Sequence, residues 1–314
     1  MMETIFFQHN AQSFSRLKLF LALSRTHHGI LDLATPCLGA LLWLGRIPDL
    51  FTVVIGSVTA FAGYTAVYAL NDVVDFRSDQ EKVLKSGEWS APKGLDSVYI
   101  RHPLAHGLLS LGEGIGWVVG WALLAFIGAY ILNPICALIF FISCLLEAFY
   151  CLLLRITFLR VLVSGVVKTS GGIAALFAVD PHPSGTFLWV FFLWLFLWEI
   201  GGQNVASDWA DVQEDIQVRA RTVPVKFGLQ GARIIIIFSL VLTVLLSLVL
   251  YWFIPTPLSP VYAIGALGVG IYLLLLPAYR LYKTKASQEA ANLFSRASYY
   301  PAVMLIVLMI SWIV

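Results

Sequence analysis

The strongest constraint on this chain is a series of long apolar runs, the clearest of which, residues 51–70, carries no charged side chain. A helix of about 20 apolar residues is long enough to cross a bilayer. Charged residues make up only 12% of the 314 residues, against about 25% in soluble domains, and the mean hydropathy is +0.84. The sequence therefore predicts an all-α, polytopic membrane protein surrounded by membrane lipid. Its net charge of +2 is too small to indicate a nucleic-acid partner.

Nine membrane-spanning helices around a central cavity are expected from the apolar runs. They fall at residues 29–45, 49–70, 108–132, 135–154, 158–179, 186–206, 233–254, 260–281 and 298–314. Turn-forming sequences such as Asn133-Pro134 separate them. Lys and Arg are concentrated in the connections on one side. The positive-inside rule places that side, with the N-terminus, in the cytoplasm, as for a bacterial-type inner or plasma membrane.

Two aspartate triplets have the same i, i+3, i+7 spacing, and each directly follows an apolar run. They are Asp72, Asp75 and Asp79 in the first half, and Asp208, Asp211 and Asp215 in the second. This spacing places three carboxylates on nearly the same helix face, where they would repel one another unless a cation joined them. Oxygen ligands suit Mg²⁺, which commonly binds one or two carboxylates together with substrate phosphates. One triplet could be an exposed helix end, but two favour a Mg²⁺ site, to which Asn71 and Asn204 would add amide oxygens.

A weak internal repeat relates the two halves of the chain. Each half opens with basic residues at a cytoplasmic helix start, crosses the membrane twice and then presents its triplet. Spans one to four and five to eight are expected to be parallel copies related by a pseudo-twofold axis along the membrane normal, with the ninth helix added. The two acidic helix ends would then face each other across the cavity. The chain would form one transmembrane domain, with a cytosolic lead and interfacial helix at 1–24 and cytoplasmic cap loops at 76–107 and 207–232.

Basic side chains near the triplets are candidates for binding the phosphate oxygens that a metal leaves uncovered, Arg in a bidentate manner and Lys as a point charge. The candidates are Arg25, Lys93, Arg101, Arg155, Arg160, Lys168 and Arg221. Membrane topology alone could explain many basic residues, and it explains Arg77, Lys82 and Lys85 best. Lys168 differs because it lies well inside a predicted span, where an ionisable group is costly and usually functional.

Acidic and amide side chains inside the spans are candidates for lining the cavity and contacting an acceptor substrate. The stronger candidates are Asp32, Glu199 and Gln203, and the weaker ones are Glu113 and Glu147. The structural alternative is an ion pair, for example between Lys168 and Glu147 or Glu199. The aromatic run at 187–198 is expected to be bulk that faces lipid.

Both triplets and their neighbours resemble motifs of the UbiA superfamily of intramembrane prenyltransferases. The first motif is similar to Asn71-Asp72-x-x-Asp75-x-x-x-Asp79, and the second to Asp208-x-x-Asp211-x-x-x-Asp215 followed by Arg221-Thr222. Segments 101–107 and 154–157 resemble the family's Arg-Pro-Leu-x-x-Gly and Lys-Arg-x-Thr segments, and Arg25 matches its basic residue at the first span. The resemblance covers nearly the whole chain. The sequence departs from the pattern in the long stretch between Asp79 and Arg101 and in the extra acid Glu214.

The resemblance implies a helical fold around a cavity that opens sideways to lipid, and an enzyme that transfers a prenyl group. Mg²⁺ held by both motifs would bind a polyprenyl diphosphate, the diphosphate would leave, and the allylic carbocation would attack an acceptor, often an aromatic ring. The catalytic residues would be Asp72, Asp75, Asp208, Asp211 and Arg155. We expect a 4-hydroxybenzoate-type polyprenyltransferase of quinone biosynthesis.

Other acceptors and other classes of protein are alternatives. Naphthoate, homogentisate, chlorophyllide, haem or a glycerol-phosphate lipid could replace 4-hydroxybenzoate, and terpene cyclases share the fold. A cation-coupled transporter would place its acids near the bilayer midplane, whereas these triplets lie at helix ends on one side. A CDP-alcohol phosphotransferase would carry one aspartate motif with internal Gly and Ala-Arg, which this sequence lacks. Prenyl transfer is therefore favoured.

Overall fold

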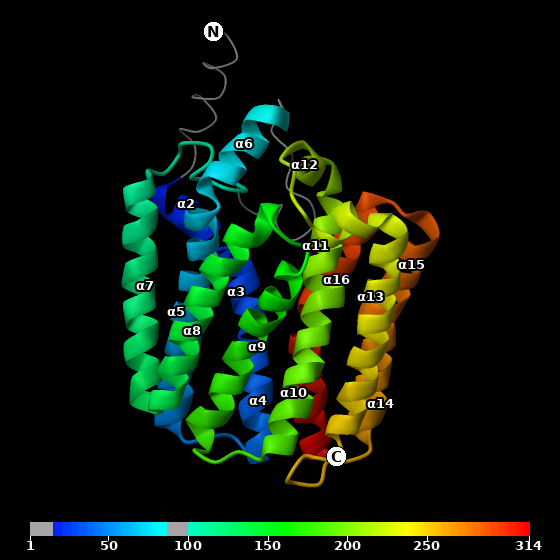
Figure 1. The fold of residues 1–314 in the computed structure, drawn as a ribbon. Helices are drawn as coiled ribbons and strands as arrows, with labels where there is room; N and C mark the ends of the chain where they lie inside the picture. Colours follow the sequence, from blue (N-terminus) through cyan, green and yellow to red (C-terminus); the bar gives the residue numbers. More distant parts are fainter. Residues whose placement is uncertain (1–14, 87–99) are drawn as a thin grey trace.

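A computed structural model describes residues 15–86 and 100–314, and within these residues it contains helices and no strand (Figure 1). Eight helical segments of this part of the chain are long and apolar enough to cross a membrane. They run side by side in one bundle, which confirms the predicted all-α membrane architecture. The segments are α5 (Leu50–Val74), α7 (Leu111–Leu132), α8 (Pro134–Leu152) with η2 (Leu153–Arg155), α9 (Arg160–Val179), α10 (Gly185–Trp198) with η3 (Glu199–Asn204) and α11 (Val205–Ala210), α13 (Val223–Leu250), α14 (Val261–Gly270) with η4 (Ile271–Leu275) and α15 (Leu276–Thr284), and α16 (Ser287–Ile313).

The first predicted span, 29–45, is two short helices and not one long helix. α3 (Thr26–Asp32) and α4 (Ala34–Leu44) follow α2 (Arg16–Leu23), and both are shorter than the roughly 20 residues that a span needs. Figure 1 shows them one after the other along the bundle, where the first of the nine crossings was expected. Gly45 ends α4 with a left-handed backbone, φ 66°, which costs glycine no Cβ strain. Hydropathy does not reveal the break after Asp32, because apolar residues continue beyond it.

Small side chains let α5 pack closely along α7. Alanines are buried on both helices, among them Ala62, Ala66, Ala125 and Ala129. A Cβ on Gly128 would lie only 2.1 Å from Thr59 Oγ1, so glycine is required at this contact. Close approach of this kind stabilises membrane helices through van der Waals contact. The packing fixes the direction of α5, whose last turn carries Asp72.

The aromatic run on α10 faces the protein interior, so the prediction that it faces lipid is wrong. Phe187, Phe191, Trp194 and Trp198 are fully buried, whereas Trp189 is exposed. The buried four follow helical spacing and form one stripe. Two of them also satisfy their indole N–H groups, since Trp194 donates to a tyrosine hydroxyl and Trp198 to a backbone carbonyl of α16. Because nearly every residue of the run is apolar, hydropathy does not distinguish the buried face from the exposed one.

One end of the bundle carries both aspartate triplets, and we call it the acidic end. α2, α6 (Phe76–Ser86) and α12 (Val212–Gln217) lie there, and the C-terminus lies at the opposite end (Figure 1). Glu113 lies in the first turn of α7, which is one of the candidate spans, and forms a capping box there with Ser110. Its carboxylate accepts hydrogen bonds from the backbone N–H and the hydroxyl of Ser110, and Glu113 is not among the residues that line the cavity.

Candidate active site

The first aspartate triplet lies where α5 ends and α6 begins. Asp72 is in the last turn of α5, Asp75 is its C-cap, and Asp79 is in the first turn of α6. Asp72 and Asp79 are buried. One oxygen from each lies within 4.8 Å of a nitrogen of His102, a grouping compact enough to surround a metal ion.

His102 is a site residue that the sequence analysis did not identify. Its Nδ1 lies 2.9 Å from Asp79 Oδ2 and 3.4 Å from Asp72 Oδ1. Burial disfavours the charged imidazole, but the attraction of Asp79 and Asp72 is stronger and raises the pKa of His102 to about 9. Burial likewise opposes ionisation of Asp79, yet His102 holds the pKa of that carboxyl below its usual value. The sequence feature that could have identified His102 is its position next to Arg101, within the 101–107 segment that resembles a family motif.

The second triplet is positioned by an irregular stretch of helix. α10 continues into the π-helix η3, then into α11 and α12, with Asp211 between the last two. Isolated π-helical turns frequently occur at functional sites. Gly201 and Gly202 allow η3 to pack tightly, since an added Cβ would lie 2.9 Å and 2.8 Å from side chains of α13 and α16. The backbone that precedes Asp208 is therefore held firmly against two other helices.

Basic residues that follow the first triplet in the chain bind the second triplet. Lys82 of α6 donates a hydrogen bond to Asp215 Oδ1 at 2.9 Å. Arg101 Nη2 donates to Asp211 Oδ2 at 2.6 Å. The sequence analysis assigned Lys82 to membrane topology, but its ammonium is part of this network. The two halves of the chain thus form one continuous charged site.

Arg160, the first residue of α9, is a buried member of the predicted diphosphate-binding residues. Its guanidinium lies 3.9 Å from the ring centroid of Tyr150, and it interacts electrostatically with Asp208 and Asp75. Within the described residues, its Nε and Nη1 have no hydrogen-bond partner. A buried guanidinium with available donors can bind an anionic oxygen.

Of the other predicted basic residues, Arg25 borders the cavity, whereas Arg155 and Arg221 lie at the protein surface. Arg25 lines the central cavity and donates to Asp72 Oδ1 at 3.2 Å. Arg155 and Arg221 have exposed side chains at the acidic end, where Arg155 pairs with an acidic residue of α6 and Arg221 donates to a backbone carbonyl. Lys93 lies outside the described residues.

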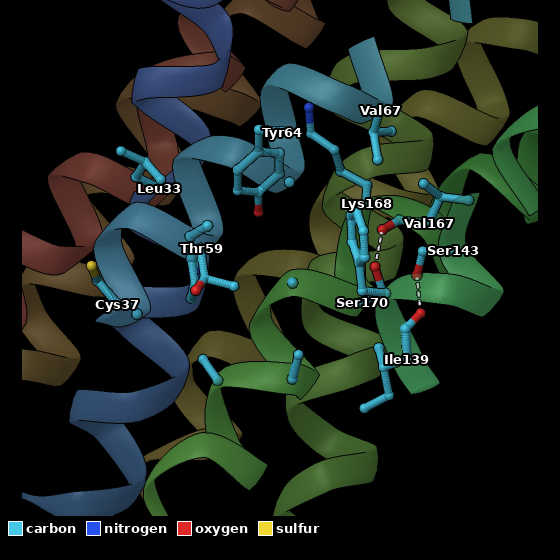
Figure 2. Close-up of a pocket in the computed structure, with 18 of the residues that line it drawn as sticks. Leu33, Cys37, Thr59, Tyr64, Val67, Ile139, Ser143, Val167, Lys168 and Ser170 are labelled. Atoms are coloured by element: carbon cyan, nitrogen blue, oxygen red, sulfur yellow. Dashed lines mark hydrogen bonds between the residues drawn. The ribbon is translucent and has the colours of Figure 1, made fainter. Parts of the chain in front are cut away.

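A cavity of about 670 Å³ extends from the acidic end into the bundle between α4, α5, α8 and α9. α5 lines it from Thr52 to Asn71, a length of about 28 Å at 1.5 Å per residue. Figure 2 shows Tyr64 and Val67 of α5 and Lys168 of α9 around this space. Asp208 and Asn71 border its acidic end, and most of the remaining wall is apolar. The cavity therefore joins a charged mouth to a long apolar channel.

Lys168 faces this cavity and is paired with Asp32. Its Nζ donates to Asp32 Oδ2 at 2.6 Å, and the hydroxyl of Tyr68 donates to the same oxygen at 2.5 Å. The structural alternative of an ion pair is therefore present, but the partner is Asp32 and not Glu147 or Glu199, which were given as examples. Their carboxylates accept hydrogen bonds from an amide and a hydroxyl group instead. The pair joins α3 to α9, which are far apart in sequence.

The three predicted acceptor-pocket residues surround the same region. Glu199 and Gln203 of η3 line the cavity, and Asp32 is buried next to Lys168. The amide of Gln203 donates to the hydroxyl of Ser298 at 3.1 Å. This part of the wall is thus polar, although it lies well inside the helical bundle.

Comparison with known sequences places these features in a protein family. Residues 33–306 match the model of the UbiA prenyltransferase family. A protein of Francisella tularensis subsp. tularensis (strain WY96-3418) named 4-hydroxybenzoate octaprenyltransferase is 24% identical over 302 residues, covering 95% of this chain and 97% of the relative. A protein of the same name from Shewanella woodyi (strain ATCC 51908 / MS32) is 25% identical over 228 residues, covering 72% of this chain and 74% of the relative.

Solved structures share the fold. The apo structure of a UbiA homologue from Aeropyrum pernix K1 superposes with a TM-score of 0.73 at 19% identity, covering 90% of this chain and 98% of the other. A UbiA homologue from Archaeoglobus fulgidus, solved with GPP and Mg²⁺, has a TM-score of 0.65 at 14% identity, covering 93% and 99%. At these identities the likeness supports the fold alone.

Proposed function

This chain belongs to the UbiA prenyltransferase family and is a prenyltransferase, and we propose that it transfers the prenyl group of a polyprenyl diphosphate to an aromatic acceptor such as 4-hydroxybenzoate. The observation that carries the proposal is one charged network that contains both aspartate triplets and lies at the end of a long apolar cavity, which Asp208 and Asn71 border. The names of the relatives support an aromatic acid as acceptor. The Archaeoglobus structures with DMAPP or GPP and Mg²⁺ support a prenyl diphosphate as donor.

Mg²⁺ fits the side chains at the acidic end. The triplets supply carboxylate oxygens, which are the ligands that Mg²⁺ prefers. Asn204 Nδ2 donates to the hydroxyl of Tyr150 at 2.9 Å, and this bond fixes the orientation of the amide. Asn204 Oδ1 is buried and has no hydrogen-bond partner among the described residues, so an oxygen is available to a cation. When bound, Mg²⁺ would stabilise the negative charge that develops on the departing diphosphate.

The basic residues of the chain would bind the phosphate oxygens that the metal leaves uncovered. Arg160 offers buried N–H groups, and Arg25 borders the cavity. Lys82 and Arg101 hold the second triplet in place through their hydrogen bonds to Asp215 and Asp211. Their positive charges also favour a dianionic ligand at the acidic end.

The apolar channel would hold the prenyl chain and protect the reactive carbocation. Its side chains expose few groups that could add to the cation, and exclusion of water prevents quenching. α6 and α12 lie over the acidic end of the bundle (Figure 1). The acceptor would bind between the diphosphate and the polar wall formed around Glu199 and Lys168.

The proposal is tested with the purified full-length protein, geranyl diphosphate, Mg²⁺ and a panel of aromatic acids and quinone precursors, with mass spectrometry of the products. We expect one geranyl group to be added to an aromatic acceptor, no product after EDTA treatment, and recovery with Mg²⁺ or Mn²⁺. A cyclised hydrocarbon without an acceptor adduct, or full turnover in EDTA, would contradict the proposal.

A further inference from the structure

One carboxylate oxygen in the cavity wall is buried without a hydrogen-bond donor. Glu199 lines the cavity and is 6% exposed. Ser164 Oγ donates to Glu199 Oε1 at 2.7 Å, whereas Oε2 has no partner in the described part of the chain. A buried carboxylate oxygen without a donor is energetically costly. Because Glu199 borders a cavity that a substrate would enter, this oxygen points to a ligand that supplies the missing donor.

α9 and η3 hold Glu199 in this position before any ligand binds. Ser164 and Lys168 lie four residues apart and therefore on one face of α9. Ser164 fixes Glu199, and Lys168 fixes Asp32. Glu199 begins the π-helix η3, whose glycines pack tightly against α13 and α16. Such an arrangement orients an accepting oxygen with little further loss of conformational freedom.

The charges around Glu199 favour a neutral donor over an anionic ligand. In the described part of this wall, Glu199 has two further carboxyl groups as charged neighbours, those of Asp32 and Glu147, and one ammonium group, that of Lys168. Lys168 already donates to Asp32 Oδ2 and to the hydroxyl of Tyr68. A ligand carboxylate placed here would meet like charge while the nearest cation is engaged. A hydroxyl group can donate one hydrogen bond without adding charge.

We propose that Glu199 Oε2 accepts a hydrogen bond from a hydroxyl group of the acceptor, and that Glu199 thereby selects hydroxylated aromatic acceptors. The inference rests on the proposed prenyl transfer and narrows its acceptor class. The acceptor hydroxyl lies against the wall formed by α9 and η3, which orients the ring within the cavity. A site built to bind a hydroxyl group discriminates strongly against an analogue that lacks the donor.

The test compares a phenolic acceptor with its O-methyl ether, 4-hydroxybenzoate against 4-methoxybenzoate, using geranyl diphosphate and Mg²⁺. The ether oxygen cannot donate, so the wild-type protein should prefer the phenol by at least about tenfold in kcat/KM, the size expected for one hydrogen bond to a charged group. Glu199→Gln can place an amide N–H at the same point, which suits an ether oxygen. The Glu199→Gln protein should therefore prefer the phenol over the ether about tenfold less than the wild type does, or prefer the ether. Its KM for geranyl diphosphate should be unchanged.

Glu113→Gln is the matched control. It makes the same chemical change in the capping box of α7, away from the cavity lining, and should keep the wild-type preference. Ser164→Ala is a second variant, because it leaves the Glu199 carboxylate in place and removes the hydroxyl that orients it. It should weaken the preference for the phenol by about threefold, as expected for a neutral hydrogen bond.

The possible failures are distinguishable. If the wild-type protein prenylates acceptors but Glu199→Gln and Ser164→Ala both keep the wild-type preference, the role of Glu199 is overturned and prenyl transfer stands. If Glu199→Gln does not fold, an unchanged preference in Ser164→Ala alone overturns it. If the wild-type protein prenylates no hydroxylated acceptor, both the inference and the proposed function fail.

Discussion

Lys82 Nζ of α6 lies 2.9 Å from Asp215 Oδ1 of α12. A direct ion pair therefore joins α6, which carries the last aspartate of the first triplet, to α12, which carries the last aspartate of the second. Asp215 is buried and the Lys82 side chain is only 16% exposed. In the metal-free protein this ammonium neutralises a carboxylate that belongs to the second triplet. The pair therefore links the position of α6 to the charge state of the proposed metal-binding residues.

Lys82→Met should destabilise the metal-free protein, because it keeps the apolar stem but leaves Asp215 buried without its cation. Breaking a buried pair on one side costs about 3–5 kcal/mol. Mg²⁺ should restore more stability to this variant than to the wild type, since a bound cation would replace the lost charge. Thermal unfolding in detergent, with EDTA and then with Mg²⁺, measures both effects.

Lys85→Met provides the control for that experiment. Lys85 lies in the same helix, but its side chain is 45% exposed and pairs with Glu81 at the surface. Surface pairs contribute little, so this variant should unfold like the wild type with and without Mg²⁺. Equal behaviour of the two variants would show that the Lys82 pair has no special role.

His102 should make the stability of the metal-free protein fall as the pH rises. The carboxylates of Asp79 and Asp72 outweigh the cost of burial and raise the pKa of His102 to about 9, above its ordinary value of about 6.5. The folded state then binds the proton more tightly than the unfolded state. This stabilisation is complete below about pH 6.5 and is lost as the pH passes through 9, an effect of about 3 kcal/mol at most.

Unfolding measured in EDTA between pH 6 and pH 9.5 tests this expectation. His102→Gln, which cannot gain a charge, should flatten the pH dependence over that range. A variant that loses stability with pH as steeply as the wild-type protein would show that another group is responsible.

Arg160→Lys should weaken binding of the prenyl diphosphate, because lysine keeps the charge but loses the planar guanidinium. We expect KM to rise by about tenfold or more, which corresponds to roughly 1.5–3 kcal/mol for a charged hydrogen bond. Arg155→Ala is the informative comparison, since Arg155 was proposed from sequence to bind the diphosphate but has an exposed side chain. If a folded Arg155→Ala protein keeps the wild-type kcat and KM, Arg155 does not bind the diphosphate, and its positive charge serves membrane topology alone.

The orientation of the protein in the membrane is a prediction from charge distribution. The connections at the acidic end carry most of the Lys and Arg residues, so we propose that this end faces the cytoplasm. In a cysteine-free background, Gln213→Cys should resist an impermeant thiol reagent applied to intact cells, whereas His182→Cys should react. Labelling at position 213 from outside would contradict this orientation.

Features that depend on residue type and local spacing were predictable from the sequence. The lack of charge in the apolar runs predicted the membrane helices, because unpaired charges are costly in lipid. The equal spacing of the Asp72 and Asp208 triplets predicted two related acidic helix ends. Both patterns are complete within short segments, so they do not require knowledge of how the segments pack.

Features that depend on contacts between distant segments could not be predicted. Lys168 pairs with Asp32, a residue 136 positions away, and hydropathy does not distinguish that partner from Glu147 or Glu199. The same reason applies to His102, which becomes part of the site only because its loop reaches Asp79. The break after Asp32 and the buried stripe of α10 were missed because uniformly apolar sequence carries no periodic signal.

The central claim is that both triplets act as one site, and a double-mutant cycle on kcat tests it most directly. Asp72→Asn and Asp208→Asn each keep the size of the side chain and one oxygen ligand but remove a negative charge. If both triplets clasp one Mg²⁺-diphosphate, each single variant should nearly abolish turnover, and the double variant should be little worse, because residues that act as a unit are strongly non-additive. Thermal unfolding measured alongside shows that the variants are folded. Additive losses of free energy, or an Asp208→Asn protein with a near wild-type rate, would contradict the claim.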